Sequence, residues 1–143
     1  MVTLVEFVKR GFKLDDFIRR KSPDLLMKQA SKIVTLNNEQ LIEGKGFDSK
    51  IMQSGYSPGY AKIRQRKGLQ TGFVDLKFSG KYQDSRKAQK AKDGINIVSN
   101  VDYEKHLRNN FPTHVGLTEK NAEQIKKLVA KDLAVEIEKY LSK

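Results

Sequence analysis

The feature that most constrains this chain is an apolar stripe close to its C-terminus. From Glu119 onward, apolar side chains recur at spacings of three and four residues over more than five turns of about 3.6 residues each. The stripe consists of Ala122, Ile125, Leu128, Val129, Leu133, Ile137, Tyr140 and Leu141. Charges of alternating sign occupy the opposite face, as on a solvated helix surface. The pattern predicts a long amphipathic C-terminal helix, capped by Thr118 at the end of the turn Gly116-Leu117-Thr118.

A second helix is predicted over residues 23–42. Its start is the sequence Ser22-Pro23-Asp24, because serine caps helices, proline is tolerated at the first helical position and aspartate favours the positive end of the dipole. The apolar stripe that follows consists of Leu25, Leu26, Gln29, Ala30, Ile33, Val34 and Leu41. Residues 1–22 form a separate N-terminal arm. Two interpretations of the arm remain open: it docks on a neighbouring subunit, or it folds onto its own core.

The middle of the chain carries strand signals. Residues 73–78 alternate apolar and polar side chains, the pattern of a half-buried strand. Asp93-Gly94 predicts a hairpin turn between strands at 86–91 and 95–99, because this dipeptide suits tight turns. A helical turn is expected at 81–85.

A short helix is also expected through Tyr103, His106 and Leu107. The predicted fold class is therefore α+β, with a small antiparallel β-sheet packed against an N-terminal helix and the long C-terminal helix. A chain of 143 residues has the size of one domain. We expect that domain to span residues 23–143 and to contain an extended loop over 43–72, where glycine and polar residues are frequent.

Positive charge is concentrated in one segment. The whole chain has 28 Lys and Arg against 17 Asp and Glu, a net charge of +11. Ten of these cations and only two acids fall within residues 61–92. Such a field attracts phosphate backbones or an acidic protein surface, although a lysine-rich run is equally often only a solubilising surface.

The residues that usually carry chemistry are scarce. Cysteine is absent, which excludes disulfides and thiol catalysis. His106 and His114 are too far apart in the pattern for a zinc motif, and no glycine sequence matches a phosphate-binding loop. No carboxylate pair suggests hydrolysis. A tyrosine nucleophile at Tyr56 or Tyr60 stays open, but tyrosines in a basic loop are far more often aromatic anchors. We expect no enzyme activity, no cofactor, no metal and no catalytic residue.

No segment reaches the roughly 18 apolar residues of a membrane helix, and the first residues lack the order of a signal peptide. The expected protein is therefore soluble, unexported and without a membrane partner.

Several short motifs, in this order, resemble small virion-morphogenesis proteins of tailed bacteriophages. They are Glu39-Gln40-Leu41, Gly44, Gly46, Tyr56-Ser57-Pro58-Gly59-Tyr60-Ala61, Lys67-Gly68, Val74-Asp75-Leu76-Lys77, Ser79-Gly80, Ser85, Asp93-Gly94, Tyr103 and Gly116-Leu117-Thr118. The chain is similar to versions from Bacteroidetes phages and prophages. More broadly, it resembles the head-tail joining and tail-completion family over residues 23–141.

The resemblance implies a structural protein without an active site. Such proteins assemble as a homo-oligomeric ring, here a hexamer or a dodecamer, at the neck or upper tail of the virion, and they act by geometry. The implied partners are other neck and tail proteins, namely portal, adaptor, tail terminator or tail tube, with non-specific contact to packaged DNA. The implied location is the head-tail interface of the virion, and the host cytoplasm during assembly. The expected subunit-contact residues are Tyr56, Pro58, Tyr60, Phe73 and Asp75.

The alternative function is a basic module that binds nucleic acid without sequence specificity. Aromatic and cationic residues interleave between Tyr56 and Lys67, as they do on single-stranded nucleic-acid platforms. The candidates for contact with DNA or with an acidic partner are Lys62, Arg64, Arg66, Lys67, Arg86, Lys87, Lys90 and Lys92.

Overall fold

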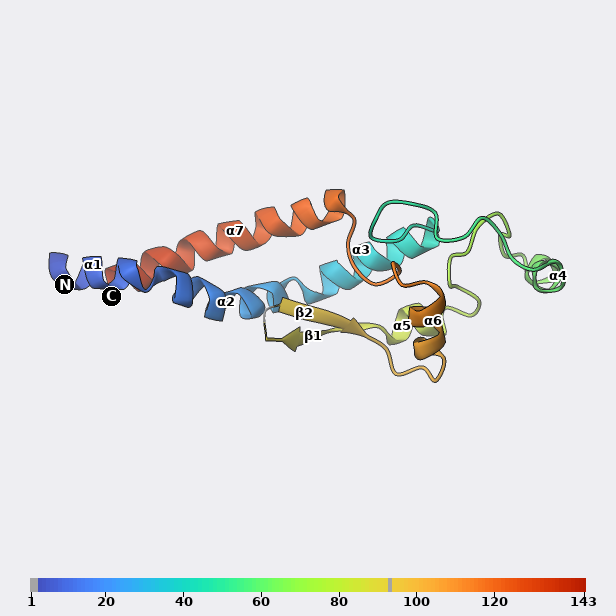
Figure 1. The fold of residues 1–143 in the computed structure, drawn as a ribbon, viewed down its shortest axis with the longest axis horizontal. Coiled ribbons are helices and arrows are strands. Elements are labelled where there is room, and N and C mark those ends of the chain that lie inside the picture. The colour runs from blue at the N-terminus through green and yellow to red at the C-terminus, as the bar shows by residue number, and fades with distance from the viewer. Residues whose placement is uncertain (1–2, 93) are drawn as a thin grey trace.

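Two long helical segments run antiparallel along the molecule in the computed structural model, which describes residues 3–92 and 94–143 (Figure 1). One segment contains three helices that follow one another almost end to end: α1 (Leu4–Phe12), α2 (Leu14–Lys28) and α3 (Ala30–Ile42). The other segment is α7 (Glu119–Ser142), whose 24 residues extend for about 36 Å. Because α7 packs on α2 and runs back toward α1, both termini lie at the same end of the molecule.

A two-stranded antiparallel hairpin lies against α2 and α3. It consists of β1 (Lys87–Ala91) and β2 (Gly94–Val98), with Lys87 opposite Val98 and Ala91 opposite Gly94. Ile97 is buried and Asn96 is exposed, as alternation requires. The predicted hairpin is therefore confirmed, while its turn residue Asp93 lies outside the described residues.

The remaining three helices of the described residues are short. They are α4 (Pro58–Arg66), α5 (Lys81–Ser85) and α6 (Glu104–Asn110). Figure 1 places α5 and α6 beside α3, whereas α4 forms the tip of the molecule. Helical structure at 81–85 and after Tyr103 agrees with the prediction. The described residues thus form seven helices and one antiparallel sheet, and the α+β class is confirmed.

The core consists of two apolar clusters. In the first, Ile33 and Leu36 of α3 meet Ile97 of β2 and Ile125 of α7. In the second, which lies among the short helices, Leu41, Tyr82 and Val101 are buried together. Phe17 of α2 also stacks on Tyr140 of α7, with ring centroids 4.2 Å apart. Together these contacts join the helices to the hairpin.

The predicted C-terminal helix is confirmed, and its cap is Thr118, whose side chain accepts a hydrogen bond from the Asn121 backbone N–H at 3.3 Å. Ile125 is the residue of α7 that is fully buried, so most of the apolar stripe is only partly covered. Among the described residues, no helix combines the length and the apolar content that a bilayer crossing needs.

The predicted helix start at Ser22 is wrong. Pro23 lies inside α2, and the Ser22 hydroxyl donates to the Ile18 carbonyl oxygen at 2.7 Å. The break between helices falls instead at Gln29. The reason is tertiary: Phe17 stacks on Tyr140 of α7, and nine residues of α2 precede the proline. The expected boundary between an arm and a domain therefore falls within a continuous helix.

Two further expectations for the middle region need correction. The extended loop 43–72 contains α4, which begins at Pro58. Residues 73–78 do not form a strand: Val74 and Asp75 are both buried although they are adjacent, and Leu76 has a φ of 57°. The alternation is broken because the side chain of Asp75 turns inward to a buried arginine.

Candidate assembly surfaces and basic segments

Arg64 holds the tip of the molecule together. Helix α4 places its side chain inside the tip, where it is 1% exposed. The guanidinium Nε donates to the Gln70 carbonyl oxygen at 2.9 Å, and Nη1 donates to that of Lys77 at 2.8 Å. Nη2 contacts both oxygens of Asp75 at 3.1 and 3.3 Å. The planar fork thus fixes two loop segments and one carboxylate at once.

Asp75 is the anionic centre of the same cluster. It is 6% exposed, and its carboxylate accepts hydrogen bonds from four residues. Besides Arg64, the donors are the Tyr56 hydroxyl at 3.0 Å, the Gln70 side-chain amide at 2.9 Å and the Lys77 backbone N–H at 2.9 Å. A buried charge with this many partners serves folding, because each partner offsets part of the desolvation cost.

Aromatic rings cover this ion pair. The Tyr56 ring lies 4.2 Å from the Arg64 Cζ atom, and its edge meets Tyr60 at a centroid distance of 5.3 Å. Tyr60 in turn stacks on Phe78 at 6.0 Å. Stacking of a guanidinium on an aromatic face is favourable, so the rings stabilise the cluster as well as shield it.

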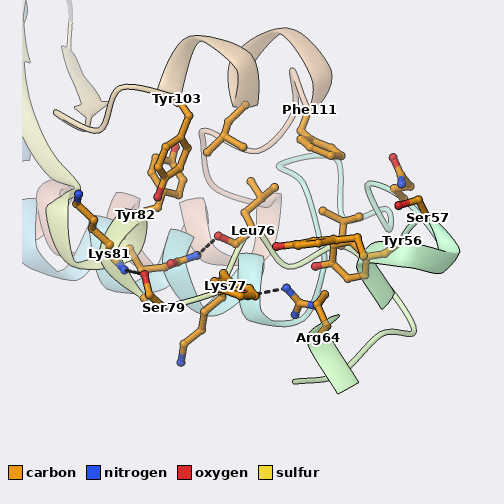
Figure 2. A pocket seen from close by; sticks show the side chains of 17 residues that line it. Tyr56, Ser57, Arg64, Leu76, Lys77, Ser79, Lys81, Tyr82, Tyr103 and Phe111 are labelled. Atoms are coloured by element: carbon orange, nitrogen blue, oxygen red, sulfur yellow. Dashed lines mark hydrogen bonds between the residues drawn. The ribbon is translucent and has the colours of Figure 1, made fainter. Parts of the chain in front are cut away.

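A groove of about 820 Å³ opens beside this cluster, between the tip and the short helices. Figure 2 shows Tyr56 and Arg64 on one side of the groove and Tyr82 and Tyr103 on the other, with Phe111 above Tyr56. Burial raises the pKa of the Tyr56 phenol to about 12, so its hydroxyl stays protonated at neutral pH. Its hydrogen bond to Asp75 occupies that hydroxyl. These contacts attach the Tyr56 side chain to the Arg64–Asp75 pair, as expected for an aromatic anchor.

The five expected subunit-contact residues have different environments. Pro58 and Tyr60 are exposed on α4, while Tyr56 and Phe73 are half-buried. Asp75 is buried inside the tip, which leaves it little surface for the expected subunit contact.

The eight candidate cations separate into three groups. Arg64 and Arg86 are buried; the Arg86 guanidinium donates to the side-chain oxygens of Asn37 and Asn38. This corrects the expectation that these two face a partner. The other six are exposed, three in or directly after α4 and three in or directly after β1: Lys62, Arg66, Lys67, Lys87, Lys90 and Lys92. Figure 1 places α4 at the tip and β1 near the middle of the molecule, so they do not form one continuous stripe.

The group on β1 lies next to further cations that the candidates did not include. Arg19 and Arg20 of α2 line a shallow cleft together with Lys90 and Lys92. Lys90 also pairs with Asp24, which reduces the net charge at this cleft.

A second buried network fixes the segment before α7. The Asn37 side-chain amide donates to the carbonyl oxygens of His114 at 3.1 Å and Gly116 at 2.8 Å. Gln40, one turn further along α3, donates to Gly116 at 3.0 Å and accepts from the Thr118 backbone N–H at 3.0 Å. Two amide side chains of α3 thus replace the strand-like pairing that this irregular segment lacks.

His114 is completely buried within this network. Its Nδ1 lies 2.7 Å from the Phe111 carbonyl oxygen, which can only accept, so Nδ1 carries the proton. In the neutral ring Nε2 therefore accepts from the Tyr82 hydroxyl, at 2.6 Å. Burial lowers the pKa of His114, which favours this neutral form. His114 is structural, and among the described residues no group of three His, Cys, Asp or Glu side chains could hold a metal ion.

Comparisons with protein-family models, with curated proteins and with solved structures find no match to this chain. Function is therefore inferred from the residues and surfaces described above.

The N-terminal arm contains a helix, α1, that the sequence analysis did not predict. Its apolar residues Leu4, Val5, Phe7, Val8 and Phe12 are between 43% and 87% exposed. The signal was present, because these positions fall on one side of a helix while Glu6, Lys9 and Arg10 fall on the other. Thr3 was a second signal, since Thr3 and Glu6 satisfy each other's backbone N–H groups in a capping box.

Proposed function

We propose that this protein is a non-catalytic assembly subunit of a tailed-bacteriophage virion, and that it forms a ring at the head-tail joint or the upper tail. The observation that carries the proposal is the exposed apolar face of α1. A helix that exposes a row of leucine, valine and phenylalanine side chains marks a surface that another protein covers. The order of the short sequence motifs resembles that of tail-completion proteins, and for this reason we place the assembly surface in a virion.

The hydrogen bonding of the buried polar side chains, at the tip and before α7, supports a structural role. Arg64, Asp75, Tyr56 and His114 all have their polar atoms bonded within the chain. Side chains whose polar atoms are hydrogen-bonded within the chain hold loops in place, whereas a catalytic side chain must be able to contact a substrate. The partners we propose are further copies of the chain and neighbouring neck or tail proteins, with assembly in the host cytoplasm.

The experiment is to look for the protein in particles. Phage particles purified from a host that carries the gene are analysed by mass spectrometry and by electron microscopy, with and without a stop codon in the gene. We expect the protein in complete particles, and separate heads and tails when it is missing. Normal, infectious particles that lack the protein would contradict the proposal.

The second candidate is a nucleic-acid-binding module, which the cleft beside Arg19, Arg20, Lys90 and Lys92 favours. Fluorescence anisotropy with a labelled oligonucleotide, measured across salt concentrations, tests it. Charge reversal of Arg20 and Lys92 should weaken binding and reduce the salt dependence by about one unit of slope per lost phosphate contact. A matched reversal of Lys62 and Arg66 on α4 tests the tip. Unchanged affinity in both variants would exclude this function for the two basic groups.

A further inference from the structure

The apolar face of α1 is turned away from its own chain. Arg10, on the polar face, donates from Nη1 to the Tyr140 carbonyl oxygen at the C-terminal end of α7, at 3.2 Å. Leu4 and Phe12, on the apolar face, are 78% and 87% exposed. The N-terminal end of α1 is nevertheless stabilised by the capping box of Thr3 and Glu6. An amphipathic helix that packs by its charged side leaves its apolar side for a different molecule.

The same chain carries an apolar groove without an occupant among the described residues. The groove has a volume of about 910 Å³ and lies between α7 and β2. Its floor includes Ile97 and Ile125 of the first core cluster, and its walls include Leu117 and Leu133. Ala122 and Ala130 are exposed along one wall, where their small side chains leave the groove open.

We propose that α1 of one copy docks in the groove between α7 and β2 of the next copy. The choice of a second copy as the partner rests on the proposed assembly function. The contact is heterologous, because the surface that α1 presents differs from the surface that receives it. Repetition of such a contact closes a ring when the rotation between copies permits it.

The dimensions of helix and groove agree. The nine residues of α1 extend for about 13.5 Å, and the wall of the groove from Ala122 to Leu133 extends for roughly 17 Å. If a fully exposed large apolar residue presents about 150–200 Å², the five apolar residues of α1 expose roughly 550 Å². The apolar groove presents a smaller area than this, so a single contact buries less than the roughly 1,000 Å² of a standard specific interface. Each copy in a ring makes the contact twice, so ring closure adds to the stability that one contact supplies.

The helix cannot fill the groove of its own chain in this fold. It contacts α7 near Tyr140, whereas the groove begins beyond Leu133 toward the other end of the same helix. Figure 1 shows α1 at the end of the molecule that carries both termini, away from the hairpin. Folding back would require α2 to leave α7 and would break the stacking of Phe17 on Tyr140.

The test uses two variants of the full chain that disable opposite sides of the contact. The donor variant Val8→Glu/Phe12→Glu places charge on the apolar face of α1. The acceptor variant Ala130→Arg fills the groove from an exposed position. Lys9→Glu on the polar face of α1 and Ala134→Arg, an exposed position outside the groove, are the matched controls. Circular dichroism establishes that each variant is folded.

Sedimentation velocity over a range of concentrations then measures association. We expect the wild-type chain and both controls to self-associate, and each disabling variant alone to be monomeric, with dissociation constants raised at least about 30-fold. The decisive sample is the equimolar mixture of the two variants. It should contain a one-to-one dimer, because the acceptor variant still has a functional α1 and the donor variant still has an open groove.

Each other outcome overturns the inference. A mixture that stays monomeric while the wild type associates indicates a symmetric contact between two α1 helices. Association of Ala130→Arg at wild-type strength excludes the groove as the receptor. A monomeric wild type, whether or not it binds neutral phosphatidylcholine vesicles through α1, excludes a second copy. Because particle composition is measured separately, the inference can fail while the virion assignment stands, and the reverse.

Discussion

Replacement of Arg64 by methionine is the sharpest test of the cluster at the tip. The substitution keeps a long unbranched side chain but removes every donor of the guanidinium group. It deletes the hydrogen bonds to the carbonyl oxygens of Gln70 and Lys77 and both contacts to Asp75. The carboxylate then remains buried without its cation. The tip of the molecule around α4 should therefore become less stable.

The magnitude follows from what Asp75 retains. Removing one partner of a buried ion pair typically costs about 3–5 kcal/mol, because the other charge is left unpaired. Three donors still reach this carboxylate, from Tyr56, Gln70 and the Lys77 backbone. They place the expected loss at the lower end, about 3 kcal/mol. Since small proteins are stable by about 5–15 kcal/mol in total, the variant should fold but unfold at much lower urea concentration.

The assay is equilibrium urea unfolding followed by circular dichroism, together with amide hydrogen exchange. Arg66→Met is the matched control, because Arg66 lies two residues along the same helix and is exposed. We expect that control to change the free energy of unfolding by no more than about 0.5 kcal/mol. The amides of Val74 and Asp75, which donate to Gln53 and Tyr56, should lose protection only in the Arg64 variant.

A double-mutant cycle completes the argument. Asp75→Asn combined with Arg64→Met should cost less than the sum of the two single changes, because the second substitution removes the charge that the first leaves unpaired. If Arg64→Met costs no more than Arg66→Met, the ion pair does not hold the tip and the reasoning is refuted.

Three other predictions concern stability. Lowering the pH from 7.5 to 5.5 should destabilise the fold, because burial lowers the pKa of His114 and the unfolded chain takes up this proton at a higher pH than the folded chain does. In urea unfolding, the free energy of unfolding should fall with pH by at most about 1.4 kcal/mol per pH unit from this group. Gly44→Ala should cost more than about 1–2 kcal/mol in thermal unfolding, since its φ of 75° disfavours a side chain and the added carbon would lie against the Phe73 ring. Thr118→Ala should cost about 1 kcal/mol in urea unfolding through loss of the cap of α7.

Each of these predictions has a control. His106→Gln, at an exposed position, should keep the pH dependence, and a stability that does not fall between pH 7.5 and 5.5 would contradict the assignment to His114. Gly59→Ala adds a carbon that meets no atom within 4 Å, so it should be tolerated where Gly44→Ala is not. Thr118→Ser keeps a hydroxyl at the cap and should recover most of the loss.

The elements that the sequence predicted correctly are those with a local signal. The Asp93-Gly94 pair specifies a hairpin whatever surrounds it, and the stripe from Ala122 to Leu141 has a period that only a helix satisfies. The hairpin and the C-terminal helix therefore appear where they were expected.

The same local signal gave a wrong answer where tertiary contacts compete with it. Serine followed by proline occurs at Ser22 and at Ser57. At Ser57 it starts a helix, α4, which the sequence reasoning left within a loop. At Ser22 it lies inside α2, which begins before the proline and places Phe17 against Tyr140 of α7. The residues before Ser22 are helical, whereas those before Ser57 are not. The helix before Ser22 packs on α7 through the contact of Phe17 with Tyr140, a residue more than a hundred positions away.

Arg64 shows why charge density alone does not locate a binding surface. By composition it is one of ten cations in a basic segment, and nothing about its neighbours in the helix separates it from Arg66. What separates them is Asp75, one of only two acids between residues 61 and 92. A single acid in a basic, aromatic-rich loop is better understood as the partner of one buried cation than as a gap in a positive surface. With Arg64 and Arg86 inside, the basic surface has two separate groups, and the apolar face of α1 becomes the stronger indication of what this protein binds.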